Sequence, residues 1–146
     1  MKDLVEIYFK FIYKADNKEW IESMWAKPFG DFYTLCNVPM YAKEFAVGDV
    51  FSAKLINNVL YIDRLIEESG HSTIRVVFPD ESVVDTTIET LRNFGCNVEQ
   101  ITNFITVDVP PEVNYKEVVF PFLSQGENYK FWEFEEGCIS SLHAKN

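Results

Sequence analysis

Two β-rich segments separated by a pair of asparagines constrain the fold of this chain more than any other feature. Residues 49–56 and 59–66 are rich in Val, Ile, Leu and Phe, and Asn57-Asn58 lies between them. Asparagine tolerates a positive φ angle, so an Asn-Asn pair favours a two-residue turn between antiparallel strands. The sequence therefore predicts a β-hairpin over residues 49–66.

The rest of the N-terminal region also has the patterns of a β-rich protein. Residues 4–12 place apolar side chains at every second position, beginning with Val5, and this period of two predicts a half-buried strand. Residues 32–36 predict a short strand, whereas the apolar residues between positions 20 and 25 leave that segment unassigned. Several short strands within residues 1–70 predict a curled antiparallel sheet or a small β-barrel.

A strand pattern and then a helical pattern open the C-terminal region. Residues 73–78 are a β-branched run that predicts a strand. Val84, Ile88 and Leu91 lie at positions i, i+4 and i+7, so they form one apolar stripe on a helix. Gly95 follows at the position where a positive φ angle commonly ends a helix. The pattern therefore predicts a strand followed by a helix.

Two more strands, a second helix and a last strand complete the pattern. Residues 98–102 and 104–109 predict two strands that are joined tightly at Asn103. A helix is expected to open at Pro110, and the last strand is expected to begin at Phe131. The C-terminal region thus reads as strand, helix, strand, strand, helix, strand.

The fold class predicted from these elements is α+β. Their order in the C-terminal region is that of a ferredoxin-like βαββαβ plait, an antiparallel sheet with both helices on one face. We therefore expect a β-rich, barrel-like half in residues 1–70 and the ferredoxin-like half in residues 71–146. Because 146 residues are the size of one domain, the two halves are expected to form one compact unit.

Charge and cysteine content exclude several classes of protein. The chain has 13 Lys and Arg against 23 Asp and Glu, a formal net charge of −10, and such a surface repels a nucleic-acid backbone. No segment has the apolar length of a membrane span or a signal peptide. The cysteines, Cys36, Cys96 and Cys138, are widely spaced, which suits reduced thiols. We expect a cytoplasmic protein without nucleic-acid or membrane partners.

The negative charge is concentrated in one part of the chain. Between residues 80 and 136, 12 carboxylates face only Arg92, Lys116 and Lys130. This region is either a solvated face that aids solubility or a docking face for a basic protein. The candidate partner-binding carboxylates are Asp108, Glu127, Glu133, Glu135 and Glu136.

Candidate catalytic residues are few. His71 lies beside Ser72 and Thr73, which fits either a general base or a turn at the start of a strand. The cysteines are expected to be buried and inert. His71 and His143 form no spaced ligand motif with a cysteine pair. We therefore predict no catalytic residues, no metal site and no cofactor.

Five short motifs run through the chain. They are NVPMYA at residues 37–42, VGDV at 47–50, ESGHSTIRV at 68–76, GCNVE at 95–99 and VDVPP at 107–111. Together they resemble a bacterial family of small uncharacterised proteins, a domain of unknown function, over most of the chain from Trp25 to Gly137. Pro121 and the Phe-rich second helix depart from that pattern. The resemblance implies a bacterial origin and no particular chemistry.

Two functions fit these observations, and a structural or dimerising module is a third option. The first is an acidic protein-binding module that is not an enzyme. It would be an immunity protein that neutralises a cognate basic bacterial toxin, of the nuclease type, by direct binding. The alternative is a small enzyme or small-molecule-binding domain that uses a cleft between the halves near His71. The lining of that cleft would come from Asn37, Tyr41, Asp49, His71, Ser72 and Arg75.

Overall fold

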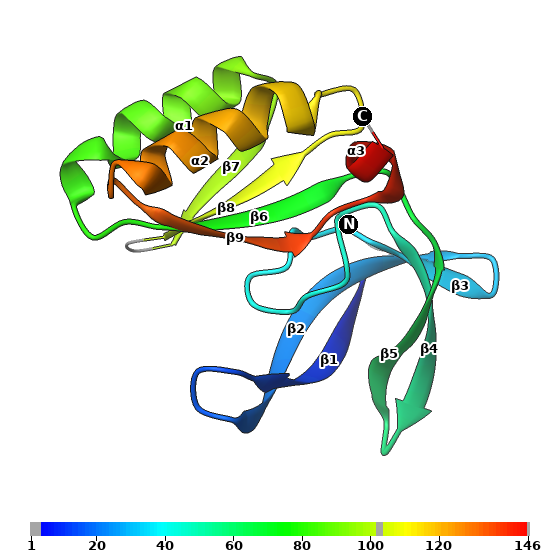
Figure 1. Ribbon diagram of the computed structural model, residues 1–146. Helices are drawn as coiled ribbons and strands as arrows, with labels where there is room; N and C mark the ends of the chain where they lie inside the picture. The colour runs from blue at the N-terminus through cyan, green and yellow to red at the C-terminus, as the bar shows by residue number, and fades with distance from the viewer. Residues whose placement is uncertain (1–3, 102–103, 146) are drawn as a thin grey trace.

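The computed structural model describes residues 4–101 and 104–145 and contains two β-sheets. Five strands of the N-terminal half curl into one sheet, and four strands of the C-terminal half form the other (Figure 1). The chain passes from the first sheet to the second between Glu67 and Ser72. Two helices cover the face of the second sheet that points away from the first (Figure 1). The predicted α+β class is confirmed.

The N-terminal sheet has five strands that pair with their neighbours in chain order, all antiparallel. The strands are β1 (Val5–Tyr13), β2 (Lys18–Phe29), β3 (Phe32–Leu35), β4 (Val50–Ile56) and β5 (Val59–Glu67). The edge strands β1 and β5 meet in parallel at one residue pair, Tyr8 and Tyr61. The sheet is thus curled, as predicted, but it lacks the continuous seam of a barrel.

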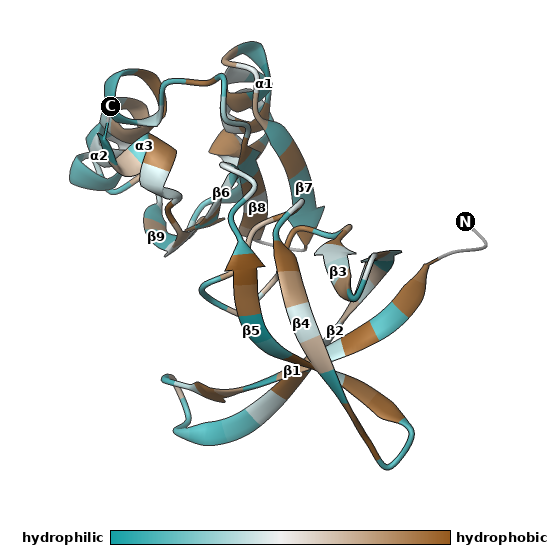
Figure 2. Ribbon diagram, turned by 90° about the vertical axis from the view of Figure 1, so that its right-hand side faces the viewer, coloured by the Kyte–Doolittle hydropathy of each residue, from teal (hydrophilic) through white to brown (hydrophobic). Residues whose placement is uncertain are grey.

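The predicted hairpin at the two asparagines is confirmed. Asn57 and Asn58 have φ angles of 51° and 66°, and Ile56 pairs with Val59 across the turn. Two successive positive φ angles match the right-handed twist of the flanking strands. The β4–β5 hairpin extends away from the helical half (Figure 2).

The segment that the sequence pattern left unassigned lies inside β2. Met24 and Ala26 are buried, while Trp25 between them is 47% exposed, which is the period of two of a strand. This strand pairs on both sides, because Met24 lies opposite Ile7 of β1 and Ala26 lies opposite Leu35 of β3.

The C-terminal half contains four strands and three α-helices in the part of the chain that is described. They are β6 (Ser72–Val77), α1 (Val84–Asn93), β7 (Asn97–Ile101), β8 (Phe104–Val109), α2 (Phe120–Asn128), β9 (Glu133–Cys138) and α3 (Ser141–Lys145). The strands lie in the order β7-β8-β6-β9, with every neighbouring pair antiparallel. The predicted junction at Asn103 and the predicted strand end at Thr102 lie outside the described residues.

The second helix begins later than its sequence pattern predicts. Pro110 lies in a turn, where its carbonyl oxygen accepts a hydrogen bond from the Val113 N–H at 3.1 Å. A π-helical turn over Tyr115–Val119 then leads into α2. Pro121 lies in the first turn of α2, the part of a helix where proline is best tolerated.

Each half has an apolar core of its own. The core of the helical half contains Ile74, Val76, Phe78, Val84, Ile88, Leu91, Cys96, Ile105, Val107, Val109, Val113, Tyr115, Val119, Leu123 and Trp132. The curled sheet and its β3–β4 loop enclose a smaller cluster of Ile7, Met24, Ala26, Leu35, Phe45, Phe51 and Ile62. The joint between the two cores is polar, and that is where the candidate site lies.

Candidate functional site

The loop between β3 and β4, residues 36–49, lies at the joint between the two sheets. On the side of the curled sheet it is held by Glu22 of β2. The Glu22 carboxylate accepts hydrogen bonds from three successive backbone N–H groups, those of Met40 at 2.6 Å, Tyr41 at 3.0 Å and Ala42 at 2.7 Å. Hydrogen bonds to an ionised carboxylate are stronger than neutral ones, so this contact anchors the loop to β2.

Arg75 of β6 holds the same stretch of loop from the other sheet. Its guanidinium donates to the carbonyl oxygens of Ala42 at 2.5 Å, of Pro39 at 3.3 Å and of Met40. Arg75 is only 5% exposed, and this burial lowers the pKa of the guanidinium, against the opposing effect of Glu135 and other nearby groups. We call residues 39–42 the clasped loop, since both sheets bind its backbone.

A glycine on the neighbouring strand makes room for the Arg75 side chain. A Cβ atom at Gly137 of β9 would lie 2.2 Å from the Arg75 Nη1 atom, closer than real Cβ contacts come. The Glu44 N–H donates to the Gly137 carbonyl oxygen at 3.2 Å, so the same residue also binds the loop directly. The joint therefore depends on three elements, β2, β6 and β9.

The clasped loop places Tyr41 in a cluster of aromatic rings that spans both halves. The Tyr41 ring centroid lies 5.5 Å from that of Trp20 in β2 and 5.8 Å from that of Phe104 in β8. The ring centroids of Tyr13 in β1 and Trp20 lie 4.2 Å apart. Such ring pairs add to the stability that burial alone supplies. Tyr41 therefore connects the curled sheet to the second sheet.

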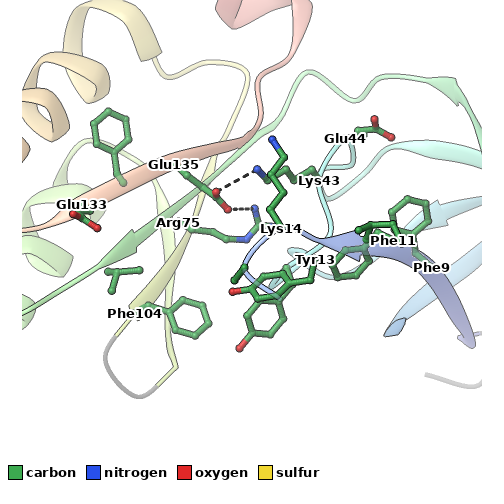
Figure 3. Close-up of a pocket in the computed structure, with 15 residues that line it drawn as sticks. Phe9, Phe11, Tyr13, Lys14, Lys43, Glu44, Arg75, Phe104, Glu133 and Glu135 are labelled. Carbon is green, nitrogen blue, oxygen red and sulfur yellow. Dashed lines mark hydrogen bonds and ion pairs between the residues drawn. The ribbon is translucent and has the colours of Figure 1, made fainter. Parts of the chain in front are cut away.

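Beside this cluster the two halves enclose a cleft of about 790 Å³ (Figure 3). Its aromatic lining consists of Phe9, Phe11, Tyr13, Tyr41, Phe104 and Phe134. Its charged lining consists of Lys14, Lys43, Glu44, Arg75, Glu133 and Glu135. The remaining lining residues are Ile12, Ala15 and Val77. The lining of the cleft thus combines aromatic side chains with charged ones.

Glu135 of β9 lies at the centre of the charged lining. Its carboxylate is 3.3 Å from the Lys43 Nζ atom and 3.4 Å from the Arg75 Nη1 atom (Figure 3). Both Lys43 and Glu135 are about half exposed, so their contact is a weak ion pair. Lys14 forms no ion pair with any residue that the structure describes.

Two of the six residues predicted to line a cleft are found in it, Tyr41 and Arg75. Asn37 instead accepts a hydrogen bond from the Trp25 N–H at 2.5 Å. Asp49 is buried and accepts hydrogen bonds from the N–H groups of Ala46 at 3.0 Å and Ser69 at 2.9 Å. Burial raises the pKa of Asp49, and these hydrogen bonds oppose that effect.

His71 forms a pair with Asp108 away from the cleft. The His71 Nδ1 atom lies 2.7 Å from one Asp108 carboxylate oxygen, and the Asn97 side chain donates to the other at 2.9 Å. In the described part of the chain no hydroxyl or thiol hydrogen-bonds to the His71 ring. Asp108 is 3% exposed, so its carboxylate lies beneath His71 and not on the predicted acidic face.

Ser72 also lies apart from the cleft, in a buried pair with His143. The Ser72 Oγ atom is 2.6 Å from His143 Nδ1, and His143 Nε2 is 3.0 Å from the Pro110 carbonyl oxygen. The Ser140 N–H donates to the same Ser72 Oγ atom at 2.9 Å. Ser72 is 0% and His143 is 1% exposed, so this pair holds α3 against β6 and is closed to a substrate.

The other predicted partner-binding carboxylates are exposed, but most have partners within the chain. The Glu127 carboxylate accepts from the Phe134 N–H at 3.0 Å, and the Glu136 carboxylate accepts from the Tyr115 hydroxyl at 2.5 Å. Burial, followed by this carboxylate, raises the pKa of Tyr115. Glu133 lines the cleft, which lies on the face of the second sheet opposite to α1 and α2.

The cysteines differ in exposure. Cys96 is buried and Cys138 is half-buried, and burial raises the pKa of each thiol to about 12, so neither is a ready nucleophile. Cys36, predicted to be buried, is exposed. No group of three His, Cys, Asp or Glu side chains within the described ranges is arranged to hold a metal ion.

Comparison with known proteins identifies the family. The model of a family described as a domain of unknown function, DUF4265, matches residues 22–134, so the chain belongs to this family. A hypothetical protein from Neisseria gonorrhoeae, known from a crystal structure, is similar with a TM-score of 0.83 and 19% sequence identity. That similarity covers 92% of this chain and 94% of the other, and it shows a shared fold. No protein with a curated description matches the sequence.

The family match includes Glu22, the clasped loop and Arg75, whereas Gly137 of the same joint lies just beyond it. The predicted resemblance to a family without an assigned activity is confirmed at this level. A search of residues 4–101 and 104–145 finds no helix with the length and apolar character needed to cross a membrane.

Proposed function

We propose that this protein is a binding module, not an enzyme, and that its ligand enters the cleft between the two halves. The observation that carries this proposal is the cleft itself, about 790 Å³ with six aromatic side chains in its lining. Ligand pockets are commonly about 300–1,000 Å³, mostly apolar, with a few polar groups that orient the ligand. The size and lining of this cleft fit that description.

The clasped loop supports the same proposal. Three hydrogen bonds from its N–H groups to Glu22 and three from Arg75 to its carbonyl oxygens hold the backbone that carries Tyr41. A wall held in this way is formed before a ligand arrives, and preorganisation lowers the entropy cost of binding. The described lining residues include no Ser, Thr, Cys or His, so the cleft lacks the side chains of a Ser–His or Cys–His catalytic pair.

Filling the cleft is expected to abolish ligand binding. Val77 lines the cleft and is 46% exposed, so Val77→Trp places a large side chain there without disturbing either apolar core. A ligand found by thermal-shift screening of a metabolite panel should bind this variant at least about tenfold more weakly, because the two would occupy the same space. Isothermal titration calorimetry measures the change.

The matched control is Val118→Trp, because Val118 is 37% exposed and lies on the helical half outside the cleft. This variant should bind the ligand as the parent protein does. The proposal is wrong if Val77→Trp retains the parent affinity for every compound that stabilises the protein.

A second candidate function is binding of a basic protein, and the uneven charge favours it. Between residues 80 and 136, 12 carboxylates oppose 3 cations, and Glu127, Glu133 and Glu136 are exposed. An acidic face of this kind speeds encounter with a basic partner and selects for it. The specific form of this proposal is an immunity protein that neutralises a basic toxin of the nuclease type. A bacterial origin and a cytoplasmic location belong to the same proposal.

Binding of a basic toxin encoded beside this protein is expected to weaken as salt rises. Between 50 mM and 300 mM NaCl, steering by exposed charges is largely screened, so the association rate should fall about tenfold. Exchanging Glu127, Glu133 and Glu136 for Gln should reproduce most of that fall at low salt, whereas the same exchange at Glu19 of the curled sheet should not. A rate that is independent of salt would remove this candidate.

The fold proposal is that the helical half is a ferredoxin-like plait. The strand order β7-β8-β6-β9, with α1 and α2 as the two connections between parallel strands, supports it. This assignment does not by itself indicate a function, because such a plait hosts many unrelated activities.

A further inference from the structure

Cationic side chains meet in the cleft although the chain as a whole is strongly acidic. The chain has 13 Lys and Arg against 23 Asp and Glu, yet Lys14, Lys43 and Arg75 all line this one cleft. They come from three separate segments: the β1–β2 turn, the β3–β4 loop and β6. Figure 3 shows the Lys14 side chain beside that of Lys43, which pairs with Glu135.

The cleft lining has as many carboxylates as cations, three of each, but they are not evenly paired. Arg75 is balanced by Glu22 behind the clasped loop and by Glu135, and Lys43 pairs with the same Glu135 carboxylate. Lys14 has no ion-pair partner among the residues described. The two other lining carboxylates, Glu44 and Glu133, lie at opposite ends of the cleft (Figure 3). Of the lining cations, Lys14 is therefore the one that no carboxylate of the described residues pairs with.

Aromatic rings lie beside these cations. Tyr13 directly precedes Lys14, and Tyr41 and Phe104 line the same cleft with their ring centroids 5.8 Å apart. Ring faces and edges of this kind pack against a planar ligand, and a lysine ammonium binds carboxylate or phosphate as a point charge. The cleft thus offers both parts of a site for a planar anion.

We propose that the ligand of this cleft is a planar aromatic molecule with an anionic group, the ring contacting Tyr41 and Phe104 and the anion contacting Lys14 and Lys43. This inference rests on the proposed binding function of the cleft and specifies its ligand class. Carboxylate and phosphate share the required chemistry, so the experiment includes both.

Three probes with one ring system test the proposal by isothermal titration calorimetry. They are 2-naphthoate, 2-naphthyl phosphate and the neutral 2-naphthylmethanol. At least one anionic probe should bind about fivefold more tightly than the alcohol, as expected for one partly exposed charge contact. Lys14→Met should weaken the binding of that anionic probe about threefold to fivefold and leave the binding of the alcohol unchanged. The anion that loses more affinity identifies the preferred group.

The matched control is Lys116→Met, which removes an exposed lysine of the helical half outside the cleft. It should leave the affinities for all three probes unchanged. If the alcohol binds as tightly as both anions and Lys14→Met changes nothing, the anion proposal is wrong. The proposed function still stands in that case, provided that Val77→Trp abolishes binding of the alcohol. If none of the probes binds, the proposed ligand class is wrong, and the binding function of the cleft is decided by the Val77→Trp test.

Discussion

Replacing Arg75 with Met is expected to lower the free energy of unfolding by about 3–5 kcal/mol. The substitution keeps most of the apolar stem but removes the donors that reach the carbonyl oxygens of Pro39, Met40 and Ala42. Buried acceptors that lose their partners cost about 1–3 kcal/mol each, and water entering the joint recovers part of that cost. Urea denaturation followed by far-UV circular dichroism measures the change.

Two further variants separate the role of the hydrogen bonds from that of charge. Arg75→Lys keeps the positive charge without the planar set of donors, so it should still lose more than half of the stability lost by Arg75→Met. Arg64→Met removes an exposed arginine of β5 and should change the stability by less than about 0.5 kcal/mol. If Arg75→Met loses no more stability than Arg64→Met, Arg75 does not hold the clasped loop in place.

Replacing Glu22 with Ala is the second large change, expected to cost about 2–4 kcal/mol of stability. The variant leaves three neighbouring backbone N–H groups without the carboxylate that accepts them. Glu22→Gln retains one acceptor oxygen and should cost about half as much. Equilibrium denaturation of both variants, with Glu19→Ala as the control at an exposed position of the same strand, measures these losses.

The effects of Glu22 and Arg75 on stability should also be coupled, because both residues bind the backbone of the clasped loop, from opposite sides. Once Glu22→Ala has loosened the clasped loop, Arg75→Met removes hydrogen bonds that are already weakened. The double variant should therefore lose less stability than the sum of the single variants, by at least about 1 kcal/mol. Strict additivity would mean that the two residues act on independent parts of the fold.

The hydrogen bonds that hold the clasped loop also determine the shape of the candidate site. Tyr41 lies within the clasped loop, and its ring contacts Trp20, Tyr13 and Phe104. A loop freed from Glu22 or Arg75 would allow the Tyr41 ring to move, and the aromatic wall of the cleft would lose its shape. The joint between the halves is therefore the feature on which the proposed ligand binding depends.

Local patterns in the sequence were sufficient for most of the secondary structure. The turn at Asn57 and Asn58 depends only on the φ angles that asparagine tolerates, and the stripe of Val84, Ile88 and Leu91 depends only on the helical period. The local signal is ambiguous at two places. The pattern of residues 20–25 leaves the middle of β2 unassigned, and the prediction of a helix start at Pro110 is wrong because Pro110 lies in a turn.

The candidate site was predicted only in part. Tyr41 and Arg75 were expected in a cleft between the halves, and both line it. Glu22, Lys14 and Phe104 were not predicted as site residues, because the sequence around each of them indicates only an ordinary surface position or strand. Asn37, Asp49, His71 and Ser72 were predicted to line the same cleft and do not, although His71 and Ser72 lie close to Arg75 in the sequence. The pleat of β6 and the approach of Asp108 and His143 direct these two side chains elsewhere.

Strand, helix and turn preferences act over a few residues, so the amino-acid sequence is enough to predict an α+β chain with a β-rich first half. The net charge of −10 also follows from the sequence alone. That Glu22 and Arg75 both bind the clasped loop, across separations of 18–36 residues, is visible only in the folded protein. The reason is physical: these side chains bind backbone N–H and carbonyl groups, which every residue type supplies, so their partners leave no signature in the sequence.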